Sequence, residues 1–120
     1  RVVQLKVFAD TATVTTGDGK YVFFVPPEFS FLFLNTVSAF VSTVSSSGAL
    51  TIQVRNITQA VDMLATAITI DQSENSSLTA TTPPAVSQTA DQIREGDLIA
   101  IDVDGAGTGA KGLGVVLVFA

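Results

Sequence analysis

The residues of this chain best suited to chemistry are three aspartates near its C-terminal end. Asp102 and Asp104 alternate along one segment and precede Gly105, a spacing that lets two carboxylates converge on a hard cation such as calcium. A helix-loop-helix calcium site needs further oxygen ligands and a Glu at the twelfth loop position, where this chain has Leu113. Together with Asp97 the same acids suggest a glycosidase pair, but closely spaced acids on a strand usually face solvent. We favour aspartates that cap a glycine turn at a strand end.

The glycine-rich segment 105–112 is a second candidate site. Phosphate-binding loops place such glycines before the N-terminus of a helix, whereas a strand-forming run at 113–119 follows them here. We therefore interpret the segment as a flexible turn. His and Cys are both absent, which removes a serine–histidine–acid triad, a thiol nucleophile and the commonest transition-metal ligands. The sequence thus predicts no enzyme, no catalytic residue, no metal site and no cofactor.

The composition indicates the size of the protein and the classes of partner that it can bind. The 120 residues allow one domain with one hydrophobic core; 47% of them are apolar and 14% are charged. The net charge is −5 and the six basic residues are scattered, so we expect no nucleic-acid partner. Residues 29–54 lack charge, but Asn35 and the break at 45–48 predict two buried strands joined by a turn, and no membrane span.

Apolar and polar residues alternate along most of the chain with the period of two that a half-buried strand requires. Leu50, Ile52 and Val54 against Thr51, Gln53 and Arg55 give the clearest pattern. Pro26-Pro27 ends an earlier strand, and residues 71–91 form a polar loop. We expect the strand at 98–103 to form a hairpin with the strand at 113–119 through the glycine-rich tip. Residues 1–120 are therefore predicted to be a single all-β domain, an antiparallel, jelly-roll-like β-sandwich.

The segment from residue 29 to residue 44 supplies the candidate interface. Apolar residues occupy both parities of the expected strand, so leaving either face in water would expose a large apolar patch. The segment therefore sits in the middle of a sandwich or against a neighbouring subunit. The interface candidates are Phe29, Phe31, Leu32, Phe33 and Leu34.

Several segments of the second half resemble small β-domain proteins encoded among the structural genes of tailed bacteriophages. These segments are 53–58, Asp62-Met63-Leu64, 69–71, Gly96-Asp97, 101–104 and 107–113, and Gly17-Asp18-Gly19-Lys20 with Val25-Pro26 is similar to the same group. The resemblance covers nearly the whole chain through scaffold features. It implies a virion protein on the particle surface.

Two functions follow from this resemblance. In the first, the chain is a head decoration (cement) protein that docks on the major capsid protein or other virion subunits as a homo-oligomer, with a trimer favoured. In the second, it is a tail-fibre or receptor-binding module whose loops touch a host surface glycan. The loop contact candidates are Asp104, Thr108 and Lys111. We expect the first, because the segment from Phe29 to Phe40 is apolar on both sides and aromatic residues with a polar group are scarce: Trp is absent and Tyr21 is the one tyrosine.

Overall fold

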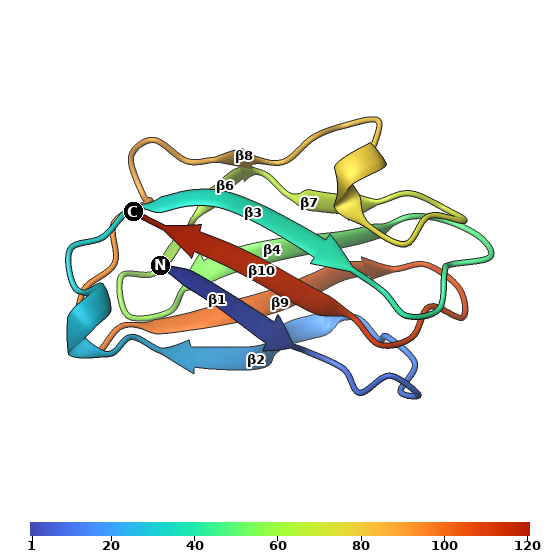
Figure 1. The fold of residues 1–120 in the computed structure, drawn as a ribbon, viewed down its shortest axis with the longest axis horizontal. Helices are drawn as coiled ribbons and strands as arrows, with labels where there is room; N and C mark the ends of the chain where they lie inside the picture. Colours follow the sequence, from blue (N-terminus) through green and yellow to red (C-terminus); the bar gives the residue numbers. More distant parts are fainter.

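The computed structural model describes residues 1–120 as two antiparallel sheets that face one another (Figure 1). One sheet has the order β1-β10-β3 and the other β2-β9-β4-β5, with β7 also paired to β4; β6 and β8 form a separate two-stranded ribbon. The strands are β1 Val2–Lys6, β2 Gly17–Phe24, β3 Leu34–Phe40, β4 Leu50–Asn56, β5 Val61–Asp62, β6 Leu64–Thr66, β7 Ile68–Ile70, β8 Ala85–Val86, β9 Leu98–Ala106 and β10 Gly114–Phe119. The expected all-β sandwich is confirmed.

From β1 to β4, and again from β9 to β10, strands that follow one another along the chain lie in different sheets. β1, β3 and β10 belong to the first sheet, and β2, β4 and β9 belong to the second. Such crossings are typical of a jelly-roll-like sandwich. They also show that the predicted hairpin is wrong, because β9 pairs with β2 and β4 while β10 pairs with β1 and β3. The alternation located both strands, but it does not specify which neighbours they choose.

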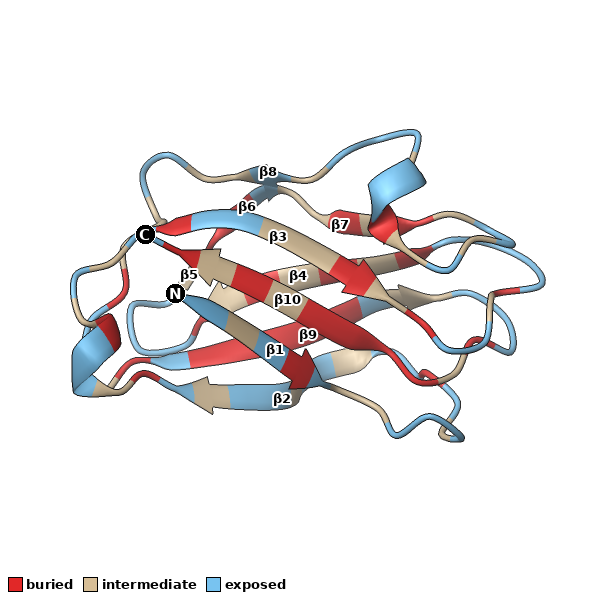
Figure 2. Cartoon of the chain, in the orientation of Figure 1, coloured by how far each residue is buried: buried red, intermediate tan, exposed pale blue.

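The core fills the space between the two sheets. Along β4 the buried residues Leu50, Ile52 and Val54 alternate with half-buried ones, as the period of two predicts. β10 in the facing sheet alternates in the same way from Val115 to Phe119, whereas the central strand β9 is buried on both faces from Ile99 to Val103 (Figure 2). Burying each such side chain contributes about 1.5–3 kcal/mol to folding. The completely buried members include Ile99, Ile101, Val115, Leu117 and Phe119.

The long strand predicted for residues 29–44 is wrong in its first part. The 3₁₀-helix η1, Pro27–Phe29, occupies its start, and β3 begins only at Leu34. Phe31 has a φ of +67°, which is incompatible with extended backbone. Phe29, Phe31 and Phe33 therefore lie in and after a tight loop, and they do not share one strand face.

The polar segment after β7 covers one edge of the first sheet. It contains the 3₁₀-helix η2, Ser77–Thr79, and the short strand β8. The N–H of Ala39 donates to Oγ of Ser77 at 3.0 Å, and the N–H of Leu34 donates to the carbonyl of Asp91 at 2.7 Å. This segment therefore covers the edge of β3 that does not pair with β10. β1, at the other edge of the same sheet, pairs only with β10.

Candidate interaction surface

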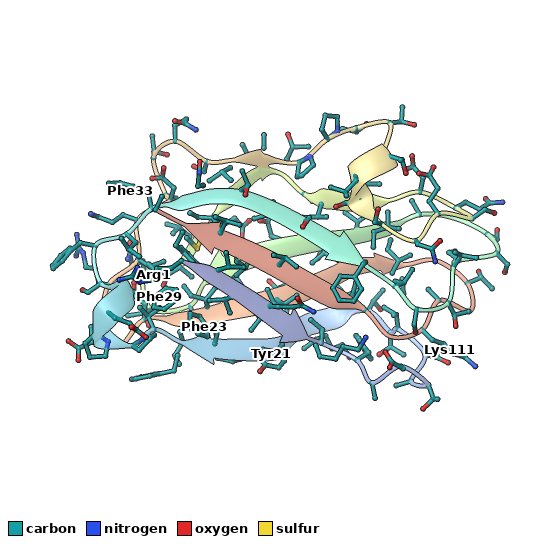
Figure 3. All side chains as sticks on the ribbon, in the orientation of Figure 1. Arg1, Tyr21, Phe23, Phe29, Phe33 and Lys111 are labelled. Atoms are coloured by element: carbon teal, nitrogen blue, oxygen red, sulfur yellow. The ribbon has the colours of Figure 1, made fainter.

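Exposed large apolar side chains gather at the end of the sandwich where the two termini lie (Figure 1). We call this region the apolar end and define it by Val22, Phe24, Phe31, Phe33, Ile57 and Leu98. Phe24 is 63% exposed, Phe31 65% and Phe33 48%. Phe33 and Lys111 lie at opposite ends of the molecule (Figure 3), whose longest extent is 39 Å. The expected aromatic contacts and the expected loop contacts are therefore far apart.

The second sheet contributes one half of the apolar end. Val22 and Phe24 of β2 pair with Ala100 and Leu98 of β9, and the N–H of Ile57 donates to the carbonyl of Leu98 at 2.8 Å. Alternation directs Val22, Phe24, Leu98 and Ile57 to the outer face, because their neighbours in the strands point into the core. Phe24 and Leu98 are direct cross-strand neighbours on the outside of the sheet, with Val22 two residues along β2 and Ile57 beside Leu98.

The loop between β2 and β3 contributes the other half, and the aromatic core fixes it. The ring of Phe29 is 8% exposed and contacts Phe23 and Phe119 edge-on, at centroid distances of 6.0 and 5.8 Å. The N–H of Phe31 donates to the carbonyl of Ile93 at 2.7 Å, and the N–H and carbonyl of Phe33 bond to Ala120. Phe31 and Phe33 therefore project from a supported backbone.

Phe31 combines backbone strain with exposure. A bulky residue rarely adopts a φ of +67°, and such conformations cost on the order of 1–3 kcal/mol. Its side chain is 65% exposed, so burial within the chain offsets little of that cost. Strained and exposed aromatic residues are typical of contact sites, because burial of the side chain against a partner can offset the cost of the strain.

The structure changes the set of interface candidates. Phe29 and Leu34 are buried and Leu32 packs against the core, so these three side chains offer little surface to a partner. Phe31 and Phe33 remain, and their role stays a prediction. The sequence reasoning missed Val22 and Phe24, although the run from Tyr21 to Val25 is apolar on both parities. Apolar residues on both faces of an edge strand are the signal that would have identified these two residues.

The loop candidates lie at the other end and are held firmly. Asp104 is part of β9 instead of the loop, on its outer face, which corrects the expected position. Thr108 is exposed, and its N–H is bonded to the buried Oγ of Ser45 at 3.0 Å. Lys111 is half-buried and exchanges two backbone hydrogen bonds with Thr43. The glycine-rich connection is thus an ordered tip.

Two of the three aspartates have structural partners. The carboxylate of Asp102 accepts hydrogen bonds from Nε of Arg55 at 2.8 Å and from the N–H of Gly19 at 2.7 Å. The bond from Arg55 raises the pKa of the Arg55 guanidinium. Asp97 is buried and accepts from Asn56, Gln59 and the N–H of Arg94. Burial alone raises the pKa of Asp97, but these hydrogen bonds outweigh it, and the pKa lies below its ordinary value.

Asp104 has no such partner. Burial, and then the negative charges of Asp102, Asp18 and Asp62, raise its pKa above the ordinary value. The four carboxylates do not form a cluster that could hold a metal ion, and the structure contains no pocket. It also contains no helix of the length and hydropathy that a membrane crossing needs.

Comparison of the chain with protein-family models, with curated protein sequences and with solved structures finds no match.

Proposed function

We propose that this chain is a structural protein of a tailed-bacteriophage particle, a head decoration subunit that assembles as a symmetric oligomer, with a trimer favoured, and contacts the major capsid protein. The observation that carries the proposal is the apolar end, with Phe24 and Phe31 each more than 60% exposed. Contiguous exposed apolar patches on a small domain mark protein contact sites. The resemblance of the sequence to β-domain proteins of phage structural genes is the reason for proposing that this contact is made on the virion.

The position of the apolar end suits a decoration subunit. It lies at one end of the 39 Å dimension, so the chain can stand on a shell while the loop with Thr108 and Lys111 at the other end faces outward. Buried aromatic residues dominate the binding energy of most protein interfaces. We expect Phe24 and Phe31 to contribute most of the affinity for the shell.

Immunogold labelling of phage particles with antiserum against the purified chain tests the location. Label over the heads is the expected result, and label confined to the tail fibres would favour a receptor-binding module. Label on no part of the particle would overturn the proposal. Co-sedimentation with undecorated heads tests the surface: Phe24→Asp should lower binding at least about 100-fold, because it places a charge in an apolar contact. Leu78→Asp is the matched control, since Leu78 is 82% exposed and lies in η2, outside the apolar end.

A further inference from the structure

The outer face of the first sheet is a second candidate interaction surface. We call it the β1–β10–β3 face; it consists of three cross-strand rows, one of Val2, Val118 and Thr36, one of Gln4, Val116 and Ser38, and one of Lys6, Gly114 and Phe40. The alternate residues of the same strands, such as Leu5, Leu117 and Ala39, point into the core. Figure 1 views the molecule from this side.

The β1–β10–β3 face carries almost no charge. Lys6 is its one ionisable residue, and Asp10 neutralises it at an Nζ–Oδ1 distance of 2.5 Å. The outer face of the second sheet differs, because it presents Arg55, Asp62, Asp102 and Asp104. The chain as a whole has a net charge of −5, and none of its carboxylates belongs to the three rows of this face.

The same face is smooth. Along β10 it presents only Gly114, Val116 and Val118, and no β-carbon fits at residue 114 because the ring of Phe40 lies against that backbone. The ammonium of Lys6 lies 5.2 Å from the centroid of this ring. Phe40 therefore covers the sheet, and the face is suited to packing against another flat surface.

The polar residues of the face favour a partner identical to the chain itself. In a symmetric oligomer, residues near the axis meet their own copies, so an unpaired charge there would face the same charge. Thr36, Ser38 and Gln4 each carry both a donor and an acceptor, and each can hydrogen-bond to its own copy. A carboxylate cannot. Because every copy has a net charge of −5, the face without free carboxylates is where copies approach with least repulsion.

We propose that the β1–β10–β3 face is the surface through which copies of this chain pack around a symmetry axis. The inference deepens the proposed function, since it rests on the oligomeric role and assigns it to named residues. It separates two contacts: copies of the chain meet through this face, and the shell meets the apolar end.

Sedimentation of charge variants tests the proposal. Val2→Glu and Thr36→Glu place a carboxylate in the row that Val118 completes, and both sites are exposed, so the fold should tolerate them. Each should weaken association at least about 100-fold, because the new carboxylates face one another. Val22→Glu is the matched control, an exposed valine on the edge strand of the other sheet, and it should leave the oligomer intact.

Cross-linking gives a readout that does not depend on charge. The chain has no Cys, so a single introduced thiol reports its own surroundings. Ser38→Cys on this face and Thr51→Cys on the outer face of the second sheet are both half-buried strand positions. A short bis-maleimide should link copies through residue 38 and not through residue 51.

Three results would overturn the inference: a monomeric wild-type chain at micromolar concentration, dissociation by Val22→Glu with no effect of Val2→Glu, or links through residue 51 alone. A monomer that still labels phage heads would refute this interface and leave the proposed location standing. Unlabelled heads, together with an oligomer that Val2→Glu dissociates, would refute the proposed location and support this interface.

Discussion

Asp97 joins three parts of the sandwich, and its removal tests how the end near the termini is held together. Its carboxylate accepts from Nδ2 of Asn56 at 3.0 Å, Nε2 of Gln59 at 2.7 Å and the N–H of Arg94 at 3.0 Å. Asp97→Ala leaves the Asn56 amide, 1% exposed, without this acceptor, which costs about 1–3 kcal/mol. Losing the charged acceptor for the other two donors adds about 1 kcal/mol. We expect the free energy of unfolding to fall by about 2–4 kcal/mol, a large part of the 5–15 kcal/mol typical of a domain.

Urea unfolding followed by circular dichroism measures this difference. The matched control is Asp91→Ala, since the Asp91 side chain makes no hydrogen bond and its removal should change stability by less than about 0.5 kcal/mol. The pKa of Asp97 is lowered in the folded state, so its contribution is present above the unfolded pKa of about 3.9 and is lost as pH falls through the folded pKa. The gap between wild type and variant should therefore narrow below about pH 4. A loss under about 1 kcal/mol, or a gap that stays constant from pH 7 to pH 3, would refute the reasoning.

Three further substitutions probe the backbone and the two faces by thermal and urea unfolding. Phe31→Gly should stabilise the chain by about 1 kcal/mol, because glycine relieves the φ of +67°; an unchanged midpoint would argue against strain. Gly114→Ala should destabilise it by about 1–3 kcal/mol, because the new methyl group overlaps the Phe40 ring; a neutral effect would mean that the ring moves freely. Asp104→Asn should stabilise it by well under about 1 kcal/mol at pH 7, because the folded-state pKa of Asp104 is raised but solvent screens this exposed carboxylate; the gain should vanish below about pH 4, and a gain that persists in acid would contradict this cause.

The strands were predictable from the sequence because their burial is periodic. Leu50, Ile52 and Val54 identify β4 without reference to any partner, and each of them is completely buried in the structure. The pairing of the strands was not predictable in the same way. A hairpin and a crossing between sheets need the same alternation in each strand, and the glycine-rich link at 105–112 is long enough for either.

The candidate surface was harder to predict, because exposure depends on which strand lies at an edge. Phe29 and Phe31 have the same residue type and the same parity, yet one is 8% and the other 65% exposed. The difference arises from η1 and from the positive φ at Phe31, which redirect the chain within two residues. Phe24 was overlooked for a related reason: an outward-facing Phe looks like a core residue until β2 is known to be an edge strand.

The direction of the symmetry axis decides whether the two proposed surfaces can act together. A three-fold axis along the 39 Å dimension, lined by the β1–β10–β3 faces, sets all apolar ends on one side of the oligomer. A two-fold axis across that dimension would set them on opposite sides, where only one could reach a flat shell. We therefore expect an axis along the 39 Å dimension in the favoured trimer, so that its binding to heads is multivalent. Val2→Glu, which keeps Phe24 and Phe31 but should give monomers, should bind heads at least about 100-fold more weakly than wild type in co-sedimentation. Equal affinity per chain would mean that one apolar end suffices and that the oligomer serves another purpose.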